Sequence, residues 1–91
     1  MSRTIWKFAF DVDDHITISM PEGAKVLTVQ QQGDDACIWA EVNPAAKPEA
    51  RFFRVFGTGH PMPCEMGYSD VHVGTWLAGP FVWHLYELTG V

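Results

Sequence analysis

The residues of this sequence that could do chemistry gather in one glycine-rich turn, Gly57-Thr58-Gly59-His60-Pro61. Its two glycines permit positive φ angles, so successive backbone N–H groups can converge on an anion. The hydroxyl of Thr58 and the ring of His60 add two further groups that can bind a ligand. The turn is not a P-loop, because the Gly-Lys-Thr ending and the following helix are missing. The sequence therefore predicts an anion-binding turn, with a plain strand-ending turn as the alternative.

Positive charge is concentrated just before this turn, in a chain that is acidic as a whole. Six Lys and Arg residues stand against eleven Asp and Glu residues, and three of the six fall within eight positions, at Lys47, Arg51 and Arg54. Arginine binds phosphate and carboxylate groups through a fork of N–H donors. Arg51 and Arg54 have opposite parity, so both cannot face one ligand from a flat strand. We predict a small anionic, phosphorylated or nucleotide-like ligand, bound by Arg51, Arg54, Thr58, Gly59 and His60.

Two tryptophans, Trp39 and Trp76, supply candidate stacking surfaces. Each has a parity opposite to that of the apolar residues around it in its segment. If those apolar neighbours face the core, both indoles lie on the surface, where they can stack on a base or contact a partner. We therefore add Trp39 and Trp76 to the candidate ligand-binding residues, with ordinary packing between two sheets as the alternative.

Metal binding and catalysis are not supported by the spacing of the remaining groups. No two of the four histidines, His15, His60, His72 and His84, are closer than twelve positions, whereas zinc ligands come in closely spaced pairs. His60 and Cys64 are close in sequence, but nothing around them resembles a cysteine nucleophile with its base. The run from Asp11 to Asp14 lacks the glycine and the distal glutamate of a calcium loop. We predict no catalytic residue, no metal and no cofactor.

Net charge and apolar runs restrict the partners and the compartment. The formal net charge of -5 disfavours general nucleic-acid binding, which needs a basic surface. The chain starts without the apolar region of a signal peptide, and no apolar run approaches the roughly 18 residues of a membrane span. Two cysteines, Cys37 and Cys64, do not make a disulfide framework. We expect a cytoplasmic protein without a membrane contact.

Seven short segments alternate between apolar and polar residues, as half-buried β-strands do. The expected strands are residues 3–10, 15–20, 25–32, 36–43, 51–56, 71–77 and 81–88. Turn residues separate them, and no segment has a convincing helical period. The short turns predict one hairpin from the first two strands and another from the third and fourth. Residues 51–56 are apolar on both faces, which suits a central strand.

The number and spacing of these strands predict an all-β fold, either a compact antiparallel β-sandwich or a small barrel. The 91 residues suit one domain, residues 1–91, and a hydrophobic content of 47% supplies its core. Segments 51–56 and 81–88 have more apolar positions than a lone domain of this size can cover. We therefore expect a homo-oligomer.

Three stretches stand out as motifs: the start Arg3-Thr4-Ile5-Trp6-Lys7-Phe8, the segment Met20-Pro21-Glu22-Gly23-Ala24 and the turn Gly57-Thr58-Gly59-His60-Pro61. With shorter matches as far as Glu87, they resemble a family of small phage and prophage proteins for which no activity is established. The resemblance covers nearly the whole chain and implies a viral setting. Small acidic phage proteins without catalytic residues often antagonise host immunity, so an analogous role is expected here.

Taken together, the residues and the resemblance predict a non-enzymatic protein that antagonises host antiviral defence in the infected cell. It would sequester a phosphorylated or nucleotide-like signalling molecule. One alternative is an acidic, anti-CRISPR-like inhibitor, whose turns Asp11 to Asp14 and Gly33 to Asp35 engage a basic surface of a host defence protein. Another alternative is a virion accessory protein, for which the residues offer no specific support.

Overall fold

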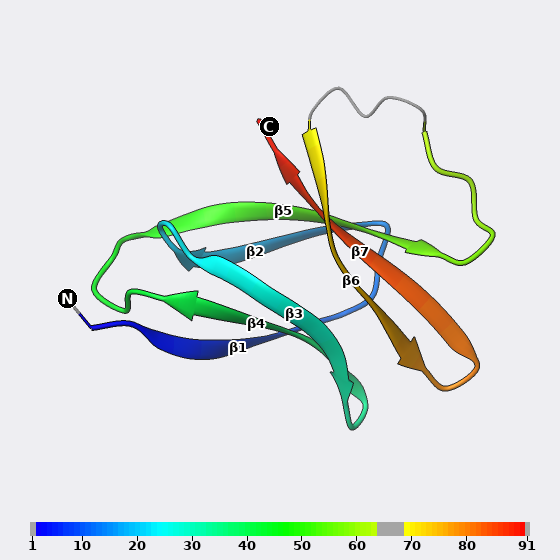
Figure 1. Ribbon diagram of the computed structural model, residues 1–91, viewed down its shortest axis with the longest axis horizontal. Coiled ribbons are helices and arrows are strands. Elements are labelled where there is room, and N and C mark those ends of the chain that lie inside the picture. The colour runs from blue at the N-terminus through cyan, green and yellow to red at the C-terminus, as the bar shows by residue number, and fades with distance from the viewer. Residues whose placement is uncertain (1, 64–68, 91) are drawn as a thin grey trace.

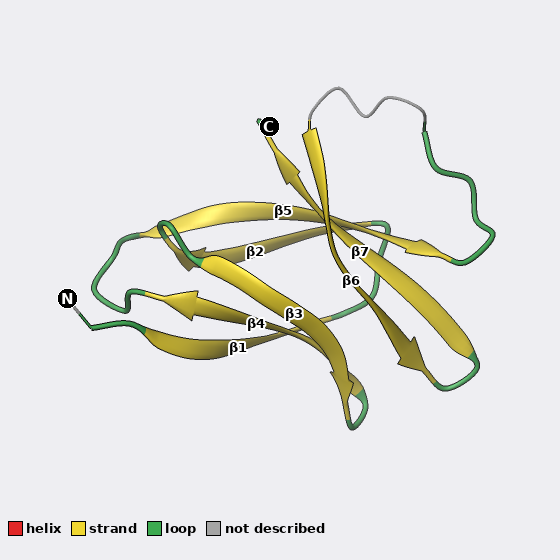
Figure 2. Cartoon of the chain, viewed as in Figure 1, coloured by secondary structure: helices red, strands yellow, loops and turns green. Residues whose placement is uncertain are grey.

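The computed structural model describes residues 2–63 and 69–90, which form seven β-strands (Figure 1). Turns and loops join the strands, as the colouring of Figure 2 shows. No helix in these two ranges is long and apolar enough to span a membrane. The strands are β1 (Thr4–Phe10), β2 (His15–Pro21), β3 (Lys25–Gln32), β4 (Asp35–Val42), β5 (Pro48–Gly57), β6 (Ser69–Ala78) and β7 (Phe81–Thr89).

The alternating segments of the sequence are the strands of the structure, so the predicted all-β fold is confirmed. β3 has the predicted ends, whereas β5 begins at Pro48, three residues earlier than predicted. The added residues belong to the strand because Pro48 pairs with Pro21 and Ala50 pairs with Ser19 of β2. Proline is tolerated at this position because it begins the strand.

Two antiparallel sheets make a small β-sandwich. One sheet has the strand order β1-β4-β3, and the other has the order β2-β5-β7-β6. β5 is a central strand, as its two apolar faces predicted. The edge strands β3 and β6 approach each other, since a Cβ atom added to Gly74 of β6 would lie 3.1 Å from a methyl group of Val29 in β3.

The predicted hairpin of the first two strands is wrong. β1 pairs with β4 and β2 pairs with β5, so that the loop at residues 11–14 crosses from one sheet to the other (Figure 1). Each of the two strands has one apolar face, and the sandwich places these faces on opposite sides of one core, against which Phe8 and Phe10 of β1 pack. Alternation in the sequence identified those faces, but it does not specify which strand lies alongside.

The predicted hairpin of the third and fourth strands is confirmed, since β3 and β4 pair in antiparallel order with Gln32 opposite Asp35. The turn between them contains Gly33 at a φ of 60°, a left-handed conformation that glycine adopts at little cost. β6 and β7 form a second hairpin across the tight turn at residues 79–80. Hairpins of this length fix the register of their strands through the turn.

The core lies between the two sheets and contains apolar side chains from both. The largest fully buried ones are Trp76, Phe53, Met20, Ile38, Leu85, Val29, Val42 and Cys37. Cys37 is a free thiol, and Cys64 lies outside the described residues. Within those residues the core contains no buried polar or charged residue, so its stability comes mainly from apolar burial.

The predicted exposure of Trp76 is wrong, because its side chain is only 1% exposed. A bulge shifts the register of β6 between His72 and Gly74, and one extra residue reverses which side chains face inward. Beyond the bulge Trp76 therefore faces the core, whereas Leu77, expected inside, is 69% exposed. Trp76 consequently cannot offer a stacking surface to a ligand from outside the sandwich.

Candidate functional site

The turn that the sequence singled out is held by its own hydrogen bonds. The N–H of His60 donates to the carbonyl of Gly57 (3.0 Å), and the N–H of Thr58 donates to the carbonyl of Val82 in β7 (3.2 Å). Gly59 has a φ of 85°, which favours glycine. The predicted anion-binding turn thus loses the N–H groups of Thr58 and His60 as donors, and these contacts favour the structural alternative.

Glycine is favoured at position 57 for a separate reason, since the ring of His60 packs against it. A Cβ atom added there would lie 2.7 Å from two atoms of that ring and 3.1 Å from the indole of Trp83. The His60 and Trp83 rings meet edge to face, with centroids 6.5 Å apart. Gly57 and Gly59 therefore have local structural roles in seating the His60 ring.

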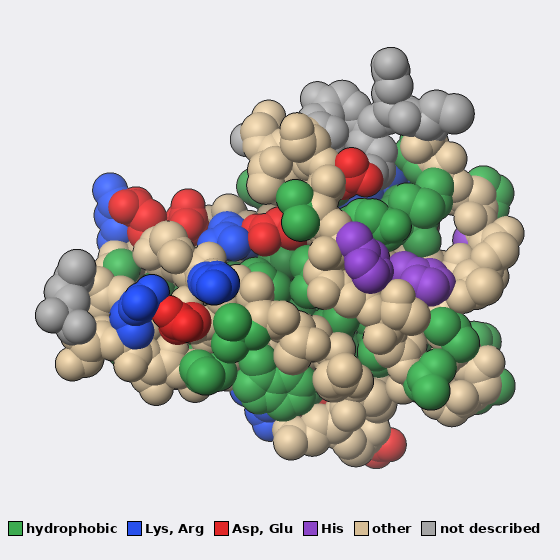
Figure 3. Space-filling model, viewed as in Figure 1, with side chains coloured by type: hydrophobic (Ala, Val, Ile, Leu, Met, Phe, Trp, Pro, Cys, Tyr) green, Lys and Arg blue, Asp and Glu red, His purple; other side chains and the backbone are tan. Residues whose placement is uncertain are grey.

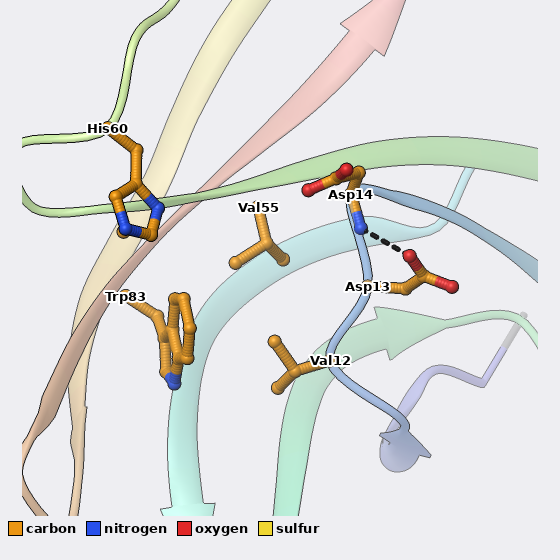
Figure 4. Close-up of a pocket in the computed structure, with 7 residues that line it drawn as sticks. Val12, Asp13, Asp14, Val55, His60 and Trp83 are labelled. Carbon is orange, nitrogen blue, oxygen red and sulfur yellow. Dashed lines mark hydrogen bonds between the residues drawn. The ribbon is translucent and has the colours of Figure 1, made fainter.

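The same end of the sandwich contains a hollow of about 300 Å³. In Figure 4 His60 and Trp83 lie on one side of it, with Val12 and the carboxylates of Asp13 and Asp14 on the other. Two carboxylates repel an anion, so this hollow does not suit the phosphorylated ligand that was predicted for His60.

Arg51 and Arg54 lie on opposite faces of β5, as their parity indicated. Arg51 points inward and donates through Nε and an η nitrogen to both carboxylate oxygens of Glu87 in β7, the second bond being 3.0 Å long. Its other η nitrogen donates to the carbonyl of Ala24 (2.8 Å). Hydrogen bonding to Glu87 raises the pKa of Arg51 above its ordinary value, although partial burial acts in the opposite direction. These contacts describe a structural clamp rather than a ligand site.

Trp39 lies on the outer face of the three-stranded sheet, as predicted, and is half-buried there between Lys7 and Thr28 of the neighbouring strands. Arg54 and Thr58, by contrast, belong to the four-stranded sheet and the turn that follows it. The structure therefore does not bring Trp39, Trp76 or Arg51 together with Arg54. Two residues of the predicted ligand-binding set are found at the outer face of the four-stranded sheet. Arg54 projects from that face, and Thr58 is hydrogen-bonded to His84 on it.

That outer face has an unusual row of side chains across all four strands. His15 of β2 lies opposite Arg54 of β5, Arg54 lies opposite Tyr86 of β7, and Tyr86 lies opposite His72 of β6. Directly opposed residues of an antiparallel pair project to the same side. The four side chains therefore form a continuous strip of two imidazoles, one guanidinium and one phenol ring, here called the His15–His72 row.

A second row beside it contains Phe56, His84 and Thr75. The guanidinium carbon of Arg54 lies 4.7 Å from the centroid of the Phe56 ring, which is a cation–π distance. Phe56 meets Tyr86 edge to face at 5.9 Å, and Tyr86 contacts the His72 ring at 5.1 Å. Figure 3 shows histidine side chains over β6 and β7 beside a hydrophobic patch.

A chain of hydrogen bonds connects the turn to this face. His84 Nε2 lies 2.7 Å from the hydroxyl of Thr58, and His84 Nδ1 lies 2.8 Å from the hydroxyl of Thr75. The Thr75 hydroxyl in turn lies 3.3 Å from Nε2 of His72. The imidazole of His84 thus fixes two threonine hydroxyls and joins residue 58 to the His15–His72 row.

The chemistry of the two rows suits an anion with a planar ring. Three of the four histidines and Arg54 lie in them, although the chain as a whole has a net charge of -5. Neither row contains an Asp or Glu residue. Arg54 also donates through Nε to the backbone carbonyl of Asp14 at 3.4 Å, which positions its guanidinium. No group of three or more metal-ligating side chains occurs in residues 2–63 and 69–90.

Comparison with known proteins places the chain in a family. The model of a domain of unknown function, DUF7352, matches residues 1–90. The chain belongs to the DUF7352 family. No curated protein and no solved structure matches it.

Sequence reasoning missed most of the face that this DUF7352 chain presents. The missed residues are His15, Phe56, His72, Thr75, His84 and Tyr86. Alternation did indicate that His15 points outward, and His84 and Tyr86 share the parity opposite to the buried Leu85. Their proximity depends on the strand order β2-β5-β7-β6, which no spacing in the sequence reveals.

Proposed function

We propose that the protein is a non-enzymatic binding protein that sequesters a phosphorylated or nucleotide-like signalling molecule on the outer face of its four-stranded sheet. The observation that carries the proposal is the His15–His72 row, which gathers Arg54, two imidazoles and the ring of Tyr86 on one face of an acidic protein. Arg54 and His15 hold the phosphate group, while Tyr86 contacts the planar ring.

The arrangement of contacts favours capture of such a ligand. Arg54 is half-buried against Phe56 and hydrogen-bonded to the backbone at Asp14, so its guanidinium is already oriented when a ligand arrives. Preorganised groups lose little rotamer freedom on binding, and this increases affinity. The hydroxyls of Thr58 and Thr75, fixed by His84, add polar groups at the edge of the same face.

The proposal is tested with a panel of cyclic and linear nucleotides, scored by the melting temperature of the protein. Binding of a ligand to the native state raises that temperature by mass action. For a nucleotide that binds, we expect Arg54→Ala to lower the affinity by about tenfold or more, as the loss of a hydrogen bond to a charged group does. Tyr86→Leu tests stacking in the same way.

The matched control is Arg3→Ala. Arg3 forms its ion pair with Glu41 of the other sheet, far along the chain from the proposed ligand contacts. The change removes the same charge, so a general electrostatic attraction weakens equally in both variants. Equal loss of affinity in the two variants, or a panel in which no nucleotide changes the melting temperature, contradicts the proposal.

We further propose that the protein is phage-encoded and acts in the cytoplasm of the infected cell, as the resemblance to phage and prophage proteins implies. Expression in a host that carries a nucleotide-signalling defence is expected to restore phage replication, and Arg54→Ala is expected to abolish that effect. The control expresses the wild type in a host whose defence uses no nucleotide signal. Restoration in that host as well points to another target.

A second candidate function is inhibition of a defence protein through an acidic surface. Pairing of β1 with β4 places Phe10 opposite Ala36, which brings the loop at residues 11–14 near the turn at residues 33–35. The exposed aspartates at this end of the sheet are Asp11, Asp13, Asp14, Asp34 and Asp35. A complex with a basic host protein that survives Asp13→Lys combined with Asp34→Lys excludes this use of the surface.

Self-association is proposed as well, because large apolar side chains remain exposed among the described residues. Leu77, Ile5, Val71 and Phe81 are between 56% and 69% exposed. Light scattering after size-exclusion chromatography measures the oligomeric state directly. A monomer at high protein concentration contradicts the predicted homo-oligomer.

A further inference from the structure

Thr58 and His84 form a pair of the kind that activates a hydroxyl. Thr58 is exposed, and its Oγ1 lies 2.7 Å from Nε2 of the half-buried His84. A hydroxyl that donates to a neutral imidazole becomes a better nucleophile, because the imidazole can accept its proton. Whether His84 accepts depends on the direction of the hydrogen bonds around it.

Two contacts of the Thr58 hydroxyl bear on that direction. The only other acceptor within hydrogen-bond distance of Thr58 Oγ1 in the described residues is the carbonyl of Val82, at 3.5 Å. Strong O–H···O bonds span about 2.5 to 3.0 Å, so this contact competes poorly for the single hydroxyl hydrogen. In the tautomer of His84 that carries its hydrogen at Nδ1, Nε2 accepts the hydrogen of Thr58 over the shorter distance of 2.7 Å.

The other two hydrogen bonds of this series are compatible with that direction. A neutral imidazole that accepts at Nε2 carries its hydrogen at Nδ1, which can donate to Thr75 Oγ1 at 2.8 Å. The hydrogen of Thr75 is then directed to Nε2 of His72, at 3.3 Å. In this tautomer Thr75 accepts from Nδ1 and orients the His84 ring, which leaves Nε2 as a base; a third residue has this place in nucleophile–base–orienter sets.

A hollow that Thr58 helps to line lies at this end of the sheet. It has a volume of about 230 Å³, and its walls include Thr58, Pro80, Phe81 and Trp83. Phe81 and Trp83 are stacked with centroids 5.4 Å apart, which gives the hollow an aromatic wall. Walls of this kind suit a short apolar acyl chain or an aryl group.

We propose that Thr58 is an acyl-acceptor site for an activated ester, with His84 as the general base. Thr58 Oγ1 attacks the ester carbonyl, and a C–O bond to Oγ1 forms as the bond from the carbonyl carbon to the aryloxy oxygen breaks. The proton passes from Oγ1 to His84 Nε2 and then to the leaving oxygen, which departs as a phenol. The protein retains one acyl group as an ester on Thr58.

The third residue of the set limits the reactivity. Thr75 offers a neutral oxygen to Nδ1, whereas an aspartate at this place would stabilise the imidazolium by its charge. We therefore expect stoichiometric acylation by esters with good leaving groups. The step goes beyond ligand capture on the His15–His72 row and does not depend on it.

The test incubates the whole chain with 4-nitrophenyl butyrate and locates the butyryl groups by peptide mapping and mass spectrometry. Thr17, an exposed threonine of β2, is the internal control because it lies in the same sample. General-base catalysis predicts acylation of Thr58 about 100-fold faster than of Thr17. Thr58→Ser is expected to keep the reaction, and His84→Gln is expected to reduce it to the rate of Thr17.

Either of two outcomes overturns the proposal: equal rates at Thr58 and Thr17 in the wild type, or an unchanged rate at Thr58 in a folded His84→Gln variant. Thr75→Val should slow the reaction while leaving the hydroxyl of Thr58 in place. If circular dichroism shows that His84→Gln does not fold, the proposal is judged from the acylation rates of Thr58 and Thr17 in the wild-type protein. Nucleotide binding can fail in the thermal assay without changing this result.

Discussion

Removing the Glu87 carboxylate should be among the most damaging single changes to this fold. Glu87 receives two hydrogen bonds from Arg51, and the side chains are only 12% and 18% exposed. Glu87→Ala leaves a largely buried guanidinium with the Ala24 carbonyl and the more distant Glu49, at 3.8 Å. Removing one partner of a buried ion pair costs about 3 to 5 kcal/mol. Because Glu49 still lies near the guanidinium, we expect the lower end of this range, about 3 kcal/mol.

Urea unfolding followed by tryptophan fluorescence measures the change in the free energy of unfolding. A loss of about 3 kcal/mol corresponds to a melting temperature lower by roughly 15 °C in a domain of this size. The matched control is Glu41→Ala, because Glu41 pairs with an Arg3 side chain that is 66% exposed. Breaking that surface pair should cost less than about 1 kcal/mol.

A double-mutant cycle separates the ion pair from simple loss of packing. Arg51→Met combined with Glu87→Leu replaces both charges by apolar groups, so no charge is left buried without a partner, and the single variants Arg51→Met and Glu87→Leu complete the cycle. We expect the double variant to be more stable than Glu87→Ala, with its loss limited to about 1 kcal/mol. The reasoning is refuted if Glu87→Ala lies within about 0.5 kcal/mol of the wild type, or if the two losses simply add.

Three further predictions concern the clamp, the turn and the core. Because Glu87 raises the pKa of Arg51, the stability that Arg51 contributes is present below its ordinary pKa and is lost only as the pH rises through the higher folded-state value. The difference in unfolding free energy between wild type and Arg51→Met should therefore be equal at about pH 7 and about pH 9; a smaller difference at the higher pH contradicts this. Gly59→Ala should cost about 1 kcal/mol in urea unfolding, because alanine is strained at a φ of 85°; an unchanged midpoint would show that the turn has relaxed. Trp76→Ala should cost about 4 kcal/mol and open a core cavity; a loss below about 1 kcal/mol would mean that Trp76 is not packed in solution.

Apolar alternation was sufficient to predict the strands, because the period of two directly reflects side chains that point to opposite faces. It placed Ile38 and Ala40 inside and Trp39 outside, and the structure agrees. Alternation failed at Trp76, because the bulge after His72 adds a residue that the pattern does not mark. A single extra residue is enough to reverse inside and outside for the remainder of a strand.

The candidate site could be predicted only in part. Parity separated Arg51 from Arg54, and the sequence drew attention to Thr58 through the glycines around it. The residues around Arg54 and Thr58 on the outer face belong to β2, β6 and β7. These strands are far from residues 54–58 in sequence, and no local pattern indicates that they lie beside them. His15 and Arg54 are 39 positions apart in sequence and become neighbours only because β2 pairs with β5.

The glycine-rich turn and the acidic composition are properties of the sequence by itself, and so are the strand positions, since local conformation and alternation follow from neighbouring residues. The tertiary structure decided which strands pair, and thereby the function of each charged group. It turned Arg51 inward to Glu87, packed His60 on Gly57 and aligned His15, Arg54, Tyr86 and His72 across one sheet. Cross-strand neighbours are set by the burial of two apolar faces in one core, and that burial is a property of the whole chain.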